Sequence, residues 1–346
     1  MTIQEAIKRV ITGASLSREE MIAVFTNVMS GGTTDAQIAS FITALRMKGE
    51  TSDEITGAAM VMRQMATKVI PSSDTHTVDT CGTGGDGSNT FNISTASAFV
   101  SAGAGAVVAK HGNRSVSSKC GSADVLEMLG VTIDLNAEQM KNCIDSVGIC
   151  FLFAPLLHKA MKYAIGPRRE IAVRTIFNVL GPLTNPANAR SQVLGVFAPE
   201  LTDVIASVLG NLGVLRAYVV YGMDGLDEIS ISAETKVSEI NNGVVRTYMI
   251  TPEEFNLQRG EKKEIAGGTP AENASIVREI LNGKKGINRD VVVLNAAFAL
   301  AASGVARDPQ EGIKLACQSI DSGKAVNVLE RLVSFTSQYK KETAAV

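Results

Sequence analysis

The sequence predicts an α/β fold: a small N-terminal helical domain followed by a larger α/β domain with a mostly parallel central sheet. Residues 1–70 carry apolar residues at helical spacing, interrupted by glycines. From residue 69 onward, short apolar runs alternate with helical segments, which is typical of a parallel sheet with crossover helices. The C-terminal part returns to helical patterns. We expect residues 1–70 to form the helical domain, helices near 155–182 to join it, and residues 71–346 to form the α/β domain.

The composition is that of an ordinary globular protein and argues against several classes. The 346 residues carry a formal net charge of −2, so no broad basic face for nucleic acid or membrane lipid is expected. The five cysteines include no Cys-x-x-Cys pair, so neither a zinc site nor a redox motif is expected. The N-terminus lacks the apolar core of a signal peptide, and the apolar run between Asp290 and Arg307 is too short to span a membrane. We expect a cytoplasmic protein.

The helical domain is expected to contain four short helices. The starts of three are marked by pairs spaced as capping boxes, which are Ser17 with Glu20, Thr34 with Gln37, and Thr51 with Glu54. Gly13 ends the first helix, and Gly31-Gly32 ends the second. The segment contains no motif that carries chemistry. Its wide apolar faces are explained equally well by packing on the main body and by an interface with a second copy of the chain.

The α/β region contains five strand candidates and one hairpin. The candidates are His76–Thr80, Ala106–Lys110, Ile149–Phe153, Val193–Phe197 and Ala217–Tyr221. Asn242-Gly243 lies between two apolar runs and is typical of a tight hairpin turn, which adds local antiparallel pairing. Thr269 and Asp308 each precede a proline at a first helical position. The segment Val291–Ala302 is apolar nearly all round, so it is expected to be a buried helix.

A glycine-rich turn, Gly82-Thr83-Gly84-Gly85-Asp86-Gly87, follows the first strand candidate and precedes a helix. It satisfies the dinucleotide-binding spacing G-x-G-x-x-G, but Lys110 and His111 stand where an acidic residue should follow the next strand. A P-loop fails too, because the last glycine is followed by Ser88-Asn89 rather than by lysine and a hydroxyl residue. A third interpretation is a turn whose bare amides bind a multiply charged anion. A plain turn beside a solvated polar loop is the structural alternative.

Two further features favour the anion-binding interpretation. Ser94 and Thr95 lie at a predicted helix N-terminus, where free amides and the helix dipole favour an anion. A basic, hydroxyl-rich loop from Lys110 to Lys119 follows the next strand candidate. The carboxyl ends of parallel strands meet at one edge of a sheet, so these two loops indicate one ligand site. Asp86 suits sugar hydroxyls or an intervening metal ion better than bare phosphate.

The segment Asp224-Gly225-Leu226-Asp227-Glu228 follows another strand candidate. Adjacent carboxylates at Asp227 and Glu228 point in different directions on an extended segment, so they could hold one or two Mg²⁺ ions shared with phosphate oxygens. An acidic surface loop is the alternative.

A further candidate lies at Arg168. A helix is expected to end at Gly166, with Pro167 opening the next one. An arginine at this junction could bind a carboxylate in a bidentate manner, although a surface arginine is the plainer interpretation.

Four stretches of the chain resemble the anthranilate phosphoribosyltransferase family. They are DTCGTGGDGSNTFNIST, KHGNRSVSSKCGSADVLEMLG, GPRREIAVRTIFNVLGPLTNP and DGLDEIS, in the family's order and spacing, and the resemblance covers essentially the whole chain. It implies a fold of the nucleoside phosphorylase/phosphoribosyltransferase type, an active site between the domains, and a homodimer through the helical domains. The implied reaction uses Mg²⁺ and transfers the phosphoribosyl group of 5-phosphoribosyl 1-pyrophosphate (PRPP) to the amine of anthranilate, with release of pyrophosphate, in tryptophan biosynthesis. Neither nucleic acid nor membrane is an expected partner.

The resemblance also implies roles for individual residues. Those expected around PRPP are Gly82, Gly85, Asp86, Thr90, Asn92, Ile93, Ser94, Thr95, Lys110, His111, Gly112, Asn113, Arg114, Ser115, Val116, Ser117, Ser118 and Ser122. Those expected around anthranilate are Gly82, Asn113 and Arg168, and those expected at the metal are Ser94, Asp227 and Glu228. Cys120 stands where many relatives carry serine, which removes a hydroxyl donor without an expected functional consequence.

The implied chemistry requires positioning and electrostatic stabilisation more than proton transfer. Pyrophosphate leaves with negative charge that Mg²⁺ and backbone amides stabilise, while the aromatic amine of anthranilate is largely unprotonated at neutral pH. We therefore assign no general base, and the histidines at 76, 111 and 158 lie outside any nucleophile motif. Two alternatives stay open: a nucleoside phosphorylase of the related fold and a non-catalytic binder of a phosphoribosyl ligand. The DGLDE and KHGNRSVSS segments favour the transferase, because orthophosphate needs no pyrophosphate-bound Mg²⁺.

Overall fold

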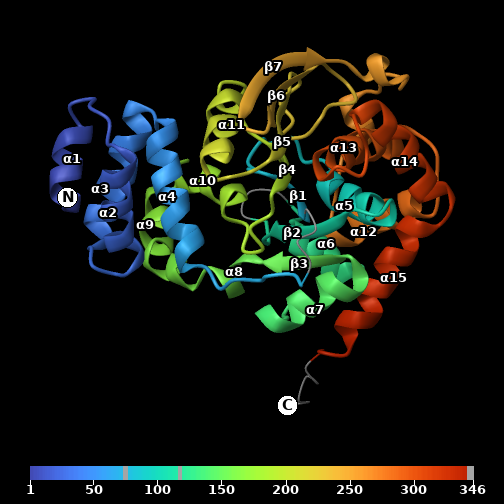
Figure 1. Cartoon of the computed structure of the whole chain (residues 1–346), viewed down its shortest axis with the longest axis horizontal. Helices are drawn as coiled ribbons and strands as arrows, with labels where there is room; N and C mark the ends of the chain where they lie inside the picture. The colour runs from blue at the N-terminus through green and yellow to red at the C-terminus, as the bar shows by residue number, and fades with distance from the viewer. Residues whose placement is uncertain (73–76, 116–118, 341–346) are drawn as a thin grey trace.

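The computed structural model of the chain describes residues 1–72, 77–115 and 119–340. Its N-terminal helices stand at one end of the molecule, beside a larger part built around a sheet (Figure 1). These helices are α1 (Ile3–Val10), α2 (Arg18–Met29), α3 (Asp35–Lys48) and α4 (Ser52–Met65). Each begins with a capping box, at Thr2, Ser17, Thr34 and Thr51 respectively, so the three boxes predicted from the sequence are confirmed.

Among the described residues, seven strands form one sheet in the order β3-β2-β1-β4-β5-β6-β7. The strands are β1 (Thr77–Gly82), β2 (Val107–Gly112), β3 (Ile149–Phe153), β4 (Ser191–Gly195), β5 (Arg216–Gly222), β6 (Thr235–Asn241) and β7 (Val244–Ile250). Strands β1 to β5 pair with one another in parallel, whereas β5 with β6 and β6 with β7 pair in antiparallel fashion. The mostly parallel sheet and the hairpin at Asn242-Gly243 are thus confirmed. The strand order reverses between β1 and β4, so the carboxyl end of β1 lies at the topological switch point.

Strand β4 occupies residues 191–195, two positions before the predicted Val193–Phe197. Backbone hydrogen bonding to β5 continues one residue beyond β4, because the Val196 amide donates to the Val220 carbonyl at 2.9 Å. The strand ends at Gly195 where the main chain of Asp227 crosses it, and a Cβ atom on Gly195 would lie 1.5 Å from the Asp227 carbonyl oxygen. A tertiary contact, which the apolar pattern does not record, therefore sets this boundary. The first residue of the first strand candidate, His76, lies outside the described residues.

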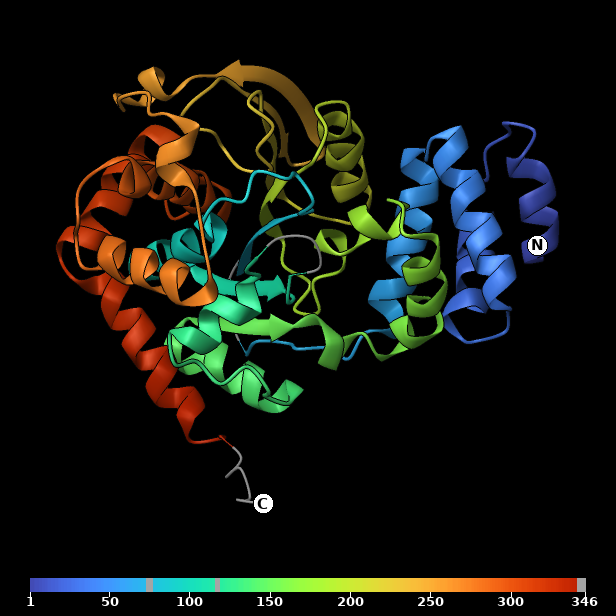
Figure 2. The ribbon, with the colours of Figure 1, turned by 180° about the vertical axis from the view of Figure 1, so that it is seen from behind.

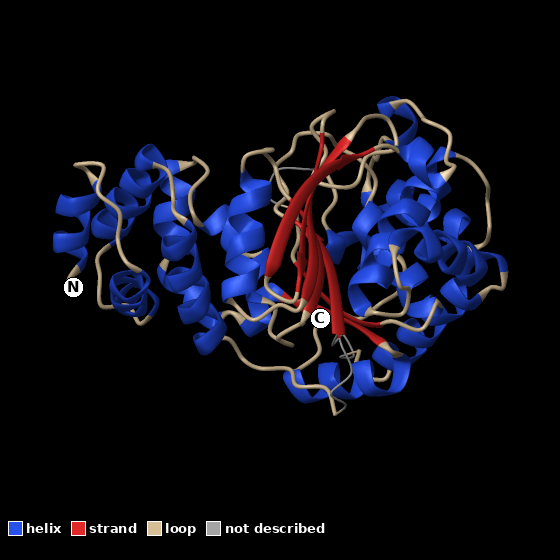
Figure 3. Ribbon diagram, turned by 45° about the horizontal axis from the view of Figure 1, so that its top comes forward, coloured by secondary structure: helices blue, strands red, loops and turns tan. Residues whose placement is uncertain are grey.

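Helices cover both faces of the sheet (Figure 3). The remaining helices are α5 (Ile93–Gly103), α6 (Ser122–Met128), α7 (Ala137–Val147), α8 (Ala154–Leu157), α9 (Ile165–Ile171), α10 (Phe177–Leu180), α11 (Leu201–Asn211), α12 (Pro270–Leu281), α13 (Ile287–Ser303), α14 (Pro309–Asp321) and α15 (Lys324–Ser337), with 3₁₀ turns at Lys159–Tyr163, Pro182–Thr184, Pro252–Phe255 and Lys262–Ile265. The predicted caps at Thr269 and Asp308 are confirmed, and α13 is buried along most of its length.

Two hydrophobic cores lie on the two faces of the sheet. Val193 and Tyr218 point into the core shared with α5 and α13, whereas their neighbours Leu194 and Ala217 point into the core shared with α11 and the N-terminal helices. This division follows from the alternation of side chains along a strand. The segment around α9 and α10, green in Figure 2, lies against the blue N-terminal helices, where α9 contacts α3. The division of the chain at residue 70 stays a prediction.

The predicted helix end at Gly166 is wrong. Gly166 and Pro167 both lie inside the first turn of α9, after a 3₁₀ turn that ends at Tyr163. Proline is tolerated there because first-turn amides have no intrahelical acceptor. Helix α9 ends instead at Ala172, which has a φ of 49°. The sequence signal for a break was therefore real but marked the start of a helix.

Candidate functional site

The glycine-rich turn leaves the carboxyl end of β1 at the switch point of the sheet. Gly84, Gly85 and Gly87 have φ values of 67°, 75° and 74°, which side chains with a Cβ atom rarely adopt. Gly82 permits a close approach, since a Cβ atom there would lie 2.3 Å from Oδ2 of Asp227. That same oxygen accepts a hydrogen bond from the amide of Gly84 at 2.7 Å. The turn is thus fixed by a carboxylate from the loop that follows β5.

The loop after β5 joins three segments through two consecutive carboxylates. Asp227 binds the glycine-rich turn, as described, while Oε1 of Glu228 accepts from the amide of Ser94 at 3.2 Å, in the first turn of α5. The two side chains therefore reach different amides, as predicted, although the backbone bends at both residues and is not extended. Helix N-termini attract anions because their first amides lack intrahelical acceptors. Glu228 is the acceptor of one such amide, that of Ser94.

The electrostatics of this region favour a divalent cation. Loss of solvent, with the nearby charge of Asp86 as the next cause, raises the pKa of Asp227 to about 7. Loss of solvent, with repulsion from Asp227 as the next cause, likewise raises the pKa of Glu228 to about 8. Lys110 is 3% exposed, and its Nζ donates to the carbonyl of Thr80 at 2.5 Å and to Oγ of Ser94 at 3.4 Å. The single positive charge of Lys110 does not balance the negative charges of the carboxylates around it.

These oxygen donors fit Mg²⁺, which commonly takes one or two carboxylates and completes its shell with water and phosphate oxygens. Within residues 1–72, 77–115 and 119–340, no group of three or more His, Cys, Asp or Glu side chains is arranged to hold a metal ion by itself. The fit therefore depends on further oxygens from a ligand. Thr95 adds a hydroxyl at the start of α5 whose oxygen is buried and has no partner in the described part of the chain.

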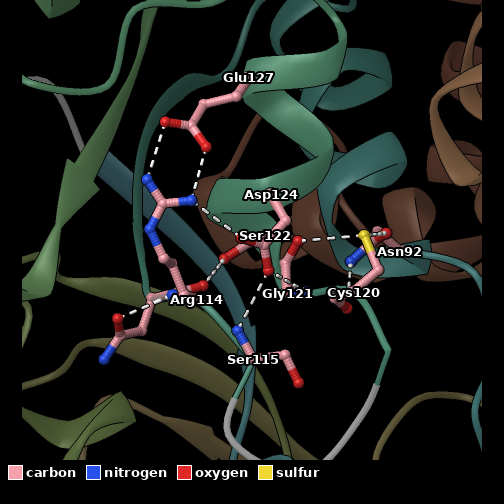
Figure 4. Close-up of polar contacts among 9 residues, drawn as sticks. Asn92, Arg114, Ser115, Cys120, Gly121, Ser122, Asp124 and Glu127 are labelled. Carbon is pink, nitrogen blue, oxygen red and sulfur yellow. Dashed lines mark hydrogen bonds and ion pairs between the residues drawn. The ribbon is translucent and has the colours of Figure 1, made fainter. Parts of the chain in front are cut away.

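The basic loop after β2 is attached to α6 by Arg114 (Figure 4). Its guanidinium group pairs with Glu127 at 2.6 Å and with Asp124 at 3.0 Å, and these contacts raise its pKa above the ordinary value. Asp124 also accepts from the amides of Ser115 at 3.3 Å and Gly121 at 2.8 Å. Arg114 thus holds the loop to the helix that follows it. Three residues expected around PRPP, Val116, Ser117 and Ser118, lie outside the described residues.

Cys120 takes part in a polar cluster around Asn92 (Figure 4). Its thiol donates to Oδ1 of Asn92 at 3.4 Å, while Nδ2 of Asn92 donates back to the Cys120 carbonyl at 3.4 Å. Asn273 of α12 donates to the same Oδ1 at 3.0 Å. A sulfur donor is weaker than a hydroxyl, but the position keeps a donor where serine was expected. The cluster joins the start of α5 to the loop before α6.

The other predicted site residues are distributed around these segments. Thr90 pairs with Ala266 in an isolated antiparallel bridge, and Oγ of Ser122 donates to the carbonyl of Asn113 at 3.2 Å. Arg168 stands apart: its guanidinium carbon lies 5.0 Å from the ring centroid of Phe177, and no hydrogen bond joins it to another predicted site residue in the described ranges. The structure therefore brings together the turn, the start of α5, Lys110 and the acidic loop.

Known proteins resemble the whole of this architecture. A model of the helical bundle domain of a glycosyl transferase family matches residues 4–66, and one of the a/b domain of a glycosyl transferase family matches residues 74–326. The anthranilate phosphoribosyltransferase of Pelotomaculum thermopropionicum is 57% identical over 344 residues, 99% of each chain. The chain belongs to the anthranilate phosphoribosyltransferase family. The crystal structure of the Thermus thermophilus member aligns with a TM-score of 0.91 and 41% identity, covering 96% of this chain and 99% of that one.

A more distant member of the family has been solved with ligands. The structure of the Saccharomyces cerevisiae anthranilate phosphoribosyltransferase in complex with PRPP and Mg aligns with a TM-score of 0.88 and 28% identity, over 97% of this chain and 98% of that chain. The small helical domain and the larger, mostly parallel α/β domain of this chain are therefore the architecture of its family. Among the described residues, no helix is both long enough and apolar enough to cross a lipid bilayer.

Sequence reasoning missed several residues that shape the site. Arg174 donates to the carbonyl of Gly85, and its guanidinium carbon lies 4.6 Å from the ring centroid of Phe197. Asp79, which is fully buried, accepts from the amide of His111 at 3.1 Å and from Nδ2 of Asn185 at 2.8 Å. An aspartate inside the strand candidate His76–Thr80 was a signal that could have been used. Nothing in the pattern around Arg174 distinguishes it from a surface arginine.

The imidazoles of His111 and His158 face each other with their Nε2 atoms 3.2 Å apart. They are 6% and 8% exposed. Burial lowers the pKa of His111 to about 3, with the facing His158 as the next cause. Burial also lowers the pKa of His158 to about 4, with Lys68 adding repulsion. Both rings are therefore neutral near pH 7, and such low pKa values make them poor proton acceptors.

We predict that this pair makes the protein sensitive to acid. A histidine with a folded pKa near 4 and an unfolded pKa near 6.5 contributes stability above pH 6.5 and loses it as the pH falls toward 4. His158→Gln should therefore lose less stability than the wild type on acidification. We expect the difference in unfolding free energy between the two to change by roughly 2 kcal/mol from pH 7 to pH 5, at up to about 1.4 kcal/mol per pH unit. Urea unfolding followed by circular dichroism at constant ionic strength measures it.

The internal control for this experiment is the range from pH 7 to pH 8.5. There both forms of the protein carry a neutral side chain at position 158, so the free-energy difference should stay constant. A difference that is also constant between pH 7 and pH 5 would contradict the low pKa assigned to His158.

Proposed function

We propose that this chain transfers the phosphoribosyl group of PRPP to the amine of anthranilate, giving N-(5-phosphoribosyl)anthranilate and pyrophosphate. The observation that carries the proposal is the meeting of three segments at the switch point of the sheet. Asp227 binds the glycine-rich turn at 2.7 Å, and Glu228 binds the first turn of α5 at 3.2 Å. Backbone amides, hydroxyls and two carboxylates then stand together, which suits a metal-bound pyrophosphate. Membership of the family supplies the identity of the donor and the acceptor.

Within this proposal the donor site consists of the residues that the sequence resemblance assigns to PRPP. The amides of the glycine-rich turn and of α5 would face phosphate oxygens, and Asp86 would accept from ribose hydroxyls. Ser94, Asp227 and Glu228 are the positions that would hold Mg²⁺. When bound there, Mg²⁺ would neutralise charge on the pyrophosphate as it leaves. The raised pKa values of Asp227 and Glu228 support this assignment, because a cation stabilises their charged forms.

The reaction breaks one bond and forms one bond at the anomeric carbon. The bond from that carbon to the pyrophosphate oxygen breaks, and both its electrons leave with pyrophosphate. The lone pair of the anthranilate nitrogen forms the new bond, and the nitrogen then releases one proton to water. An aromatic amine needs no prior deprotonation at neutral pH, so the chain's main task is to align the two substrates. The low pKa values of His111 and His158 agree with the absence of a general base from this scheme.

The acceptor residues in this proposal are Gly82, Asn113 and Arg168. Arg168 is held over the ring of Phe177, in the segment that lies against the N-terminal helices. A guanidinium fixed in this way loses little freedom when it pairs with a carboxylate. We therefore infer that it receives the carboxylate of anthranilate from the side of the helical part.

We extend the proposal to the organisation of the protein. Residues 1–70 with the helices near 155–182 would form one domain, residues 71–346 the other, and two copies would associate through the helical domains. Ile11 and Met47, which are 67% and 83% exposed, supply apolar surface for such contacts. A cytoplasmic location, with Mg²⁺ as the cofactor, completes the proposal.

The test of the proposed reaction is the fluorescence of anthranilate. We expect it to fall when PRPP and the protein are present with Mg²⁺, and to stay constant when EDTA removes the metal. Release of pyrophosphate should follow the same dependence. Phosphorolysis of a nucleoside without metal would instead favour a nucleoside phosphorylase. Binding of PRPP without turnover would favour a non-catalytic binder, and either outcome would overturn the proposal.

We predict that Asp227→Asn combined with Glu228→Gln abolishes most of the Mg²⁺-dependent turnover while the fold is retained. The expected loss in kcat/KM is at least about 100-fold, since changes in the outer shell of a metal alone typically cost about 10- to 100-fold. Steady-state rates over a range of Mg²⁺ concentrations provide the measurement. Asp134→Asn with Glu138→Gln is the matched control, because both carboxylates are exposed and distant in sequence from the acidic loop. Near-normal rates at ordinary Mg²⁺ would remove the metal assignment.

We predict that Arg168→Ala weakens the use of anthranilate far more than that of PRPP. Loss of a charged hydrogen-bonded pair corresponds to about 1.5 to 3 kcal/mol, or about 10- to 100-fold in KM for anthranilate. Initial rates with each substrate varied in turn give the two constants. Arg169→Ala, one residue away and exposed, is the matched control. Equal increases in both KM values would contradict the carboxylate role.

A further inference from the structure

Helix α13 carries one amide side chain in an otherwise apolar stretch. Between Val291 and Ala302 the residues are VVVLNAAFALAA, and all of them are buried. Asn295 is 2% exposed. The helix packs against β1, β4 and β5, the central strands whose carboxyl ends carry the site. A primary amide in such surroundings is unfavourable unless its donors and acceptor are satisfied, so the partners of Asn295 indicate what it does.

Those partners are the main chain of the acidic loop. Oδ1 of Asn295 accepts from the amide of Ile229 at 3.0 Å, and Nδ2 donates to the carbonyl of Ile229 at 2.9 Å. The second proton of Nδ2 goes to the carbonyl of Val291 at 2.9 Å, one turn earlier in the same helix. The side chain therefore holds both polar groups of one residue, Ile229, in the manner of a neighbouring strand. Ile229 itself is fully buried and directly follows Glu228.

Some other contacts close the loop on itself, whereas Asp227 and Glu228 reach the glycine-rich turn and the first turn of α5 through their side chains. Oδ2 of Asp224 accepts from the hydroxyls of Ser230, at 2.7 Å, and Ser232, so the loop's two ends are joined. The Met223 amide donates to the Glu234 carbonyl at 2.8 Å. These bonds join the two ends of the loop but do not hold its main chain to α13. The side-chain amide of Asn295 fixes the position and direction of the main chain at Ile229, the residue that follows the two carboxylates.

We propose that Asn295 is a positioning residue for the metal-binding carboxylates, acting from the buried helix through the main chain of Ile229. The inference rests on the proposed function only in the identity of the ligand, since the hydrogen bonds exist without it. A purely structural amide in this helix would be satisfied by its bond to Val291 and by partners within the core. Here the acceptor and one donor are both directed at the residue that adjoins Glu228. Loss of the amide should therefore loosen the carboxylates more than it loosens the core.

The test compares Asn295→Leu with a matched control, Ser319→Ala. Leucine keeps the volume and removes all three bonds. Ser319 is also buried, and its hydroxyl donates to the Val100 carbonyl at 2.8 Å, but it does not touch the acidic loop. Binding of Mn²⁺ would be followed by electron paramagnetic resonance in the presence of PRPP and the absence of anthranilate, so that no turnover occurs. We expect Asn295→Leu to weaken Mn²⁺ binding by about 10- to 100-fold, the range typical of outer-shell changes, and Ser319→Ala to leave it within about twofold.

A second readout follows the loop without any ligand. Hydrogen exchange of peptides covering residues 223–232 should be faster in Asn295→Leu than in Ser319→Ala, whereas the peptides of α15 should exchange alike. If the leucine variant does not fold, Asn295→Asp replaces it, because aspartate keeps an acceptor for the Ile229 amide and loses the donors. That variant should also weaken Mn²⁺ binding relative to Ser319→Ala.

The outcomes separate the two proposals. Folded Asn295 variants that bind Mn²⁺ as well as Ser319→Ala does, with unchanged exchange in residues 223–232, would overturn the positioning role. A wild-type protein that neither binds Mn²⁺ with PRPP nor consumes anthranilate would overturn the proposed function instead. In that case, faster exchange in the Asn295 variants would still support the role of this amide in fixing the loop.

Discussion

Two carboxylates that follow one another in the chain, Asp227 and Glu228, must both lie near the carboxyl edge of a mostly parallel sheet, beside the buried lysine Lys110. This constraint shapes the surrounding backbone. Gly195 ends its strand with no side chain because the main chain of Asp227 passes over it, and Gly82 leaves room for the carboxylate itself. The motif suggests that glycine is present to let the backbone approach a phosphate. Gly82 and Gly195 have a second reason, because a side chain at either position would clash with Asp227 of the acidic loop.

The same constraint explains why polar groups occur inside the helix and strand layers. Asn295 attaches the loop to α13, and Asp79 joins the end of β2 to Asn185 through two hydrogen bonds. Burial raises the pKa of Asp79 to about 6, opposed by Lys110. Polar groups this deep are unfavourable without partners, so each marks a place where the backbone is held against movement.

Features with local causes could be predicted from the sequence, and features with distant causes could not. Capping boxes, the Asn242-Gly243 hairpin and the apolar helix α13 each depend on residues within a few positions, and the structure confirms them. The end of β4 depends on Asp227, more than thirty residues away, and was placed two residues too late. The Gly166-Pro167 pair signalled a break, but only the preceding 3₁₀ turn decides that a helix begins there. For the candidate site, the sequence identified the segments that meet, whereas the pairing of Arg114 with Glu127 depends on a tertiary contact.

Because Arg114 is paired with carboxylates, the positive charge that the site offers to a ligand is smaller than the sequence suggests. Lys110 is committed to the carbonyl of Thr80, Arg114 to two carboxylates on α6, and Arg174 to the carbonyl of Gly85. Lys110 and Arg114, which the sequence offers as phosphate ligands, and Arg174 are thus largely used to hold the loops in place. A polyanion approaching this region meets backbone amides together with the carboxylates Asp227 and Glu228, whose charges would repel it. The repulsion is removed if a divalent cation arrives with the polyanion and is shared between its oxygens and the carboxylates. Under the proposed function, the acidic loop would be the reason why the substrate binds as a metal complex, because without the cation the same residues would oppose its binding.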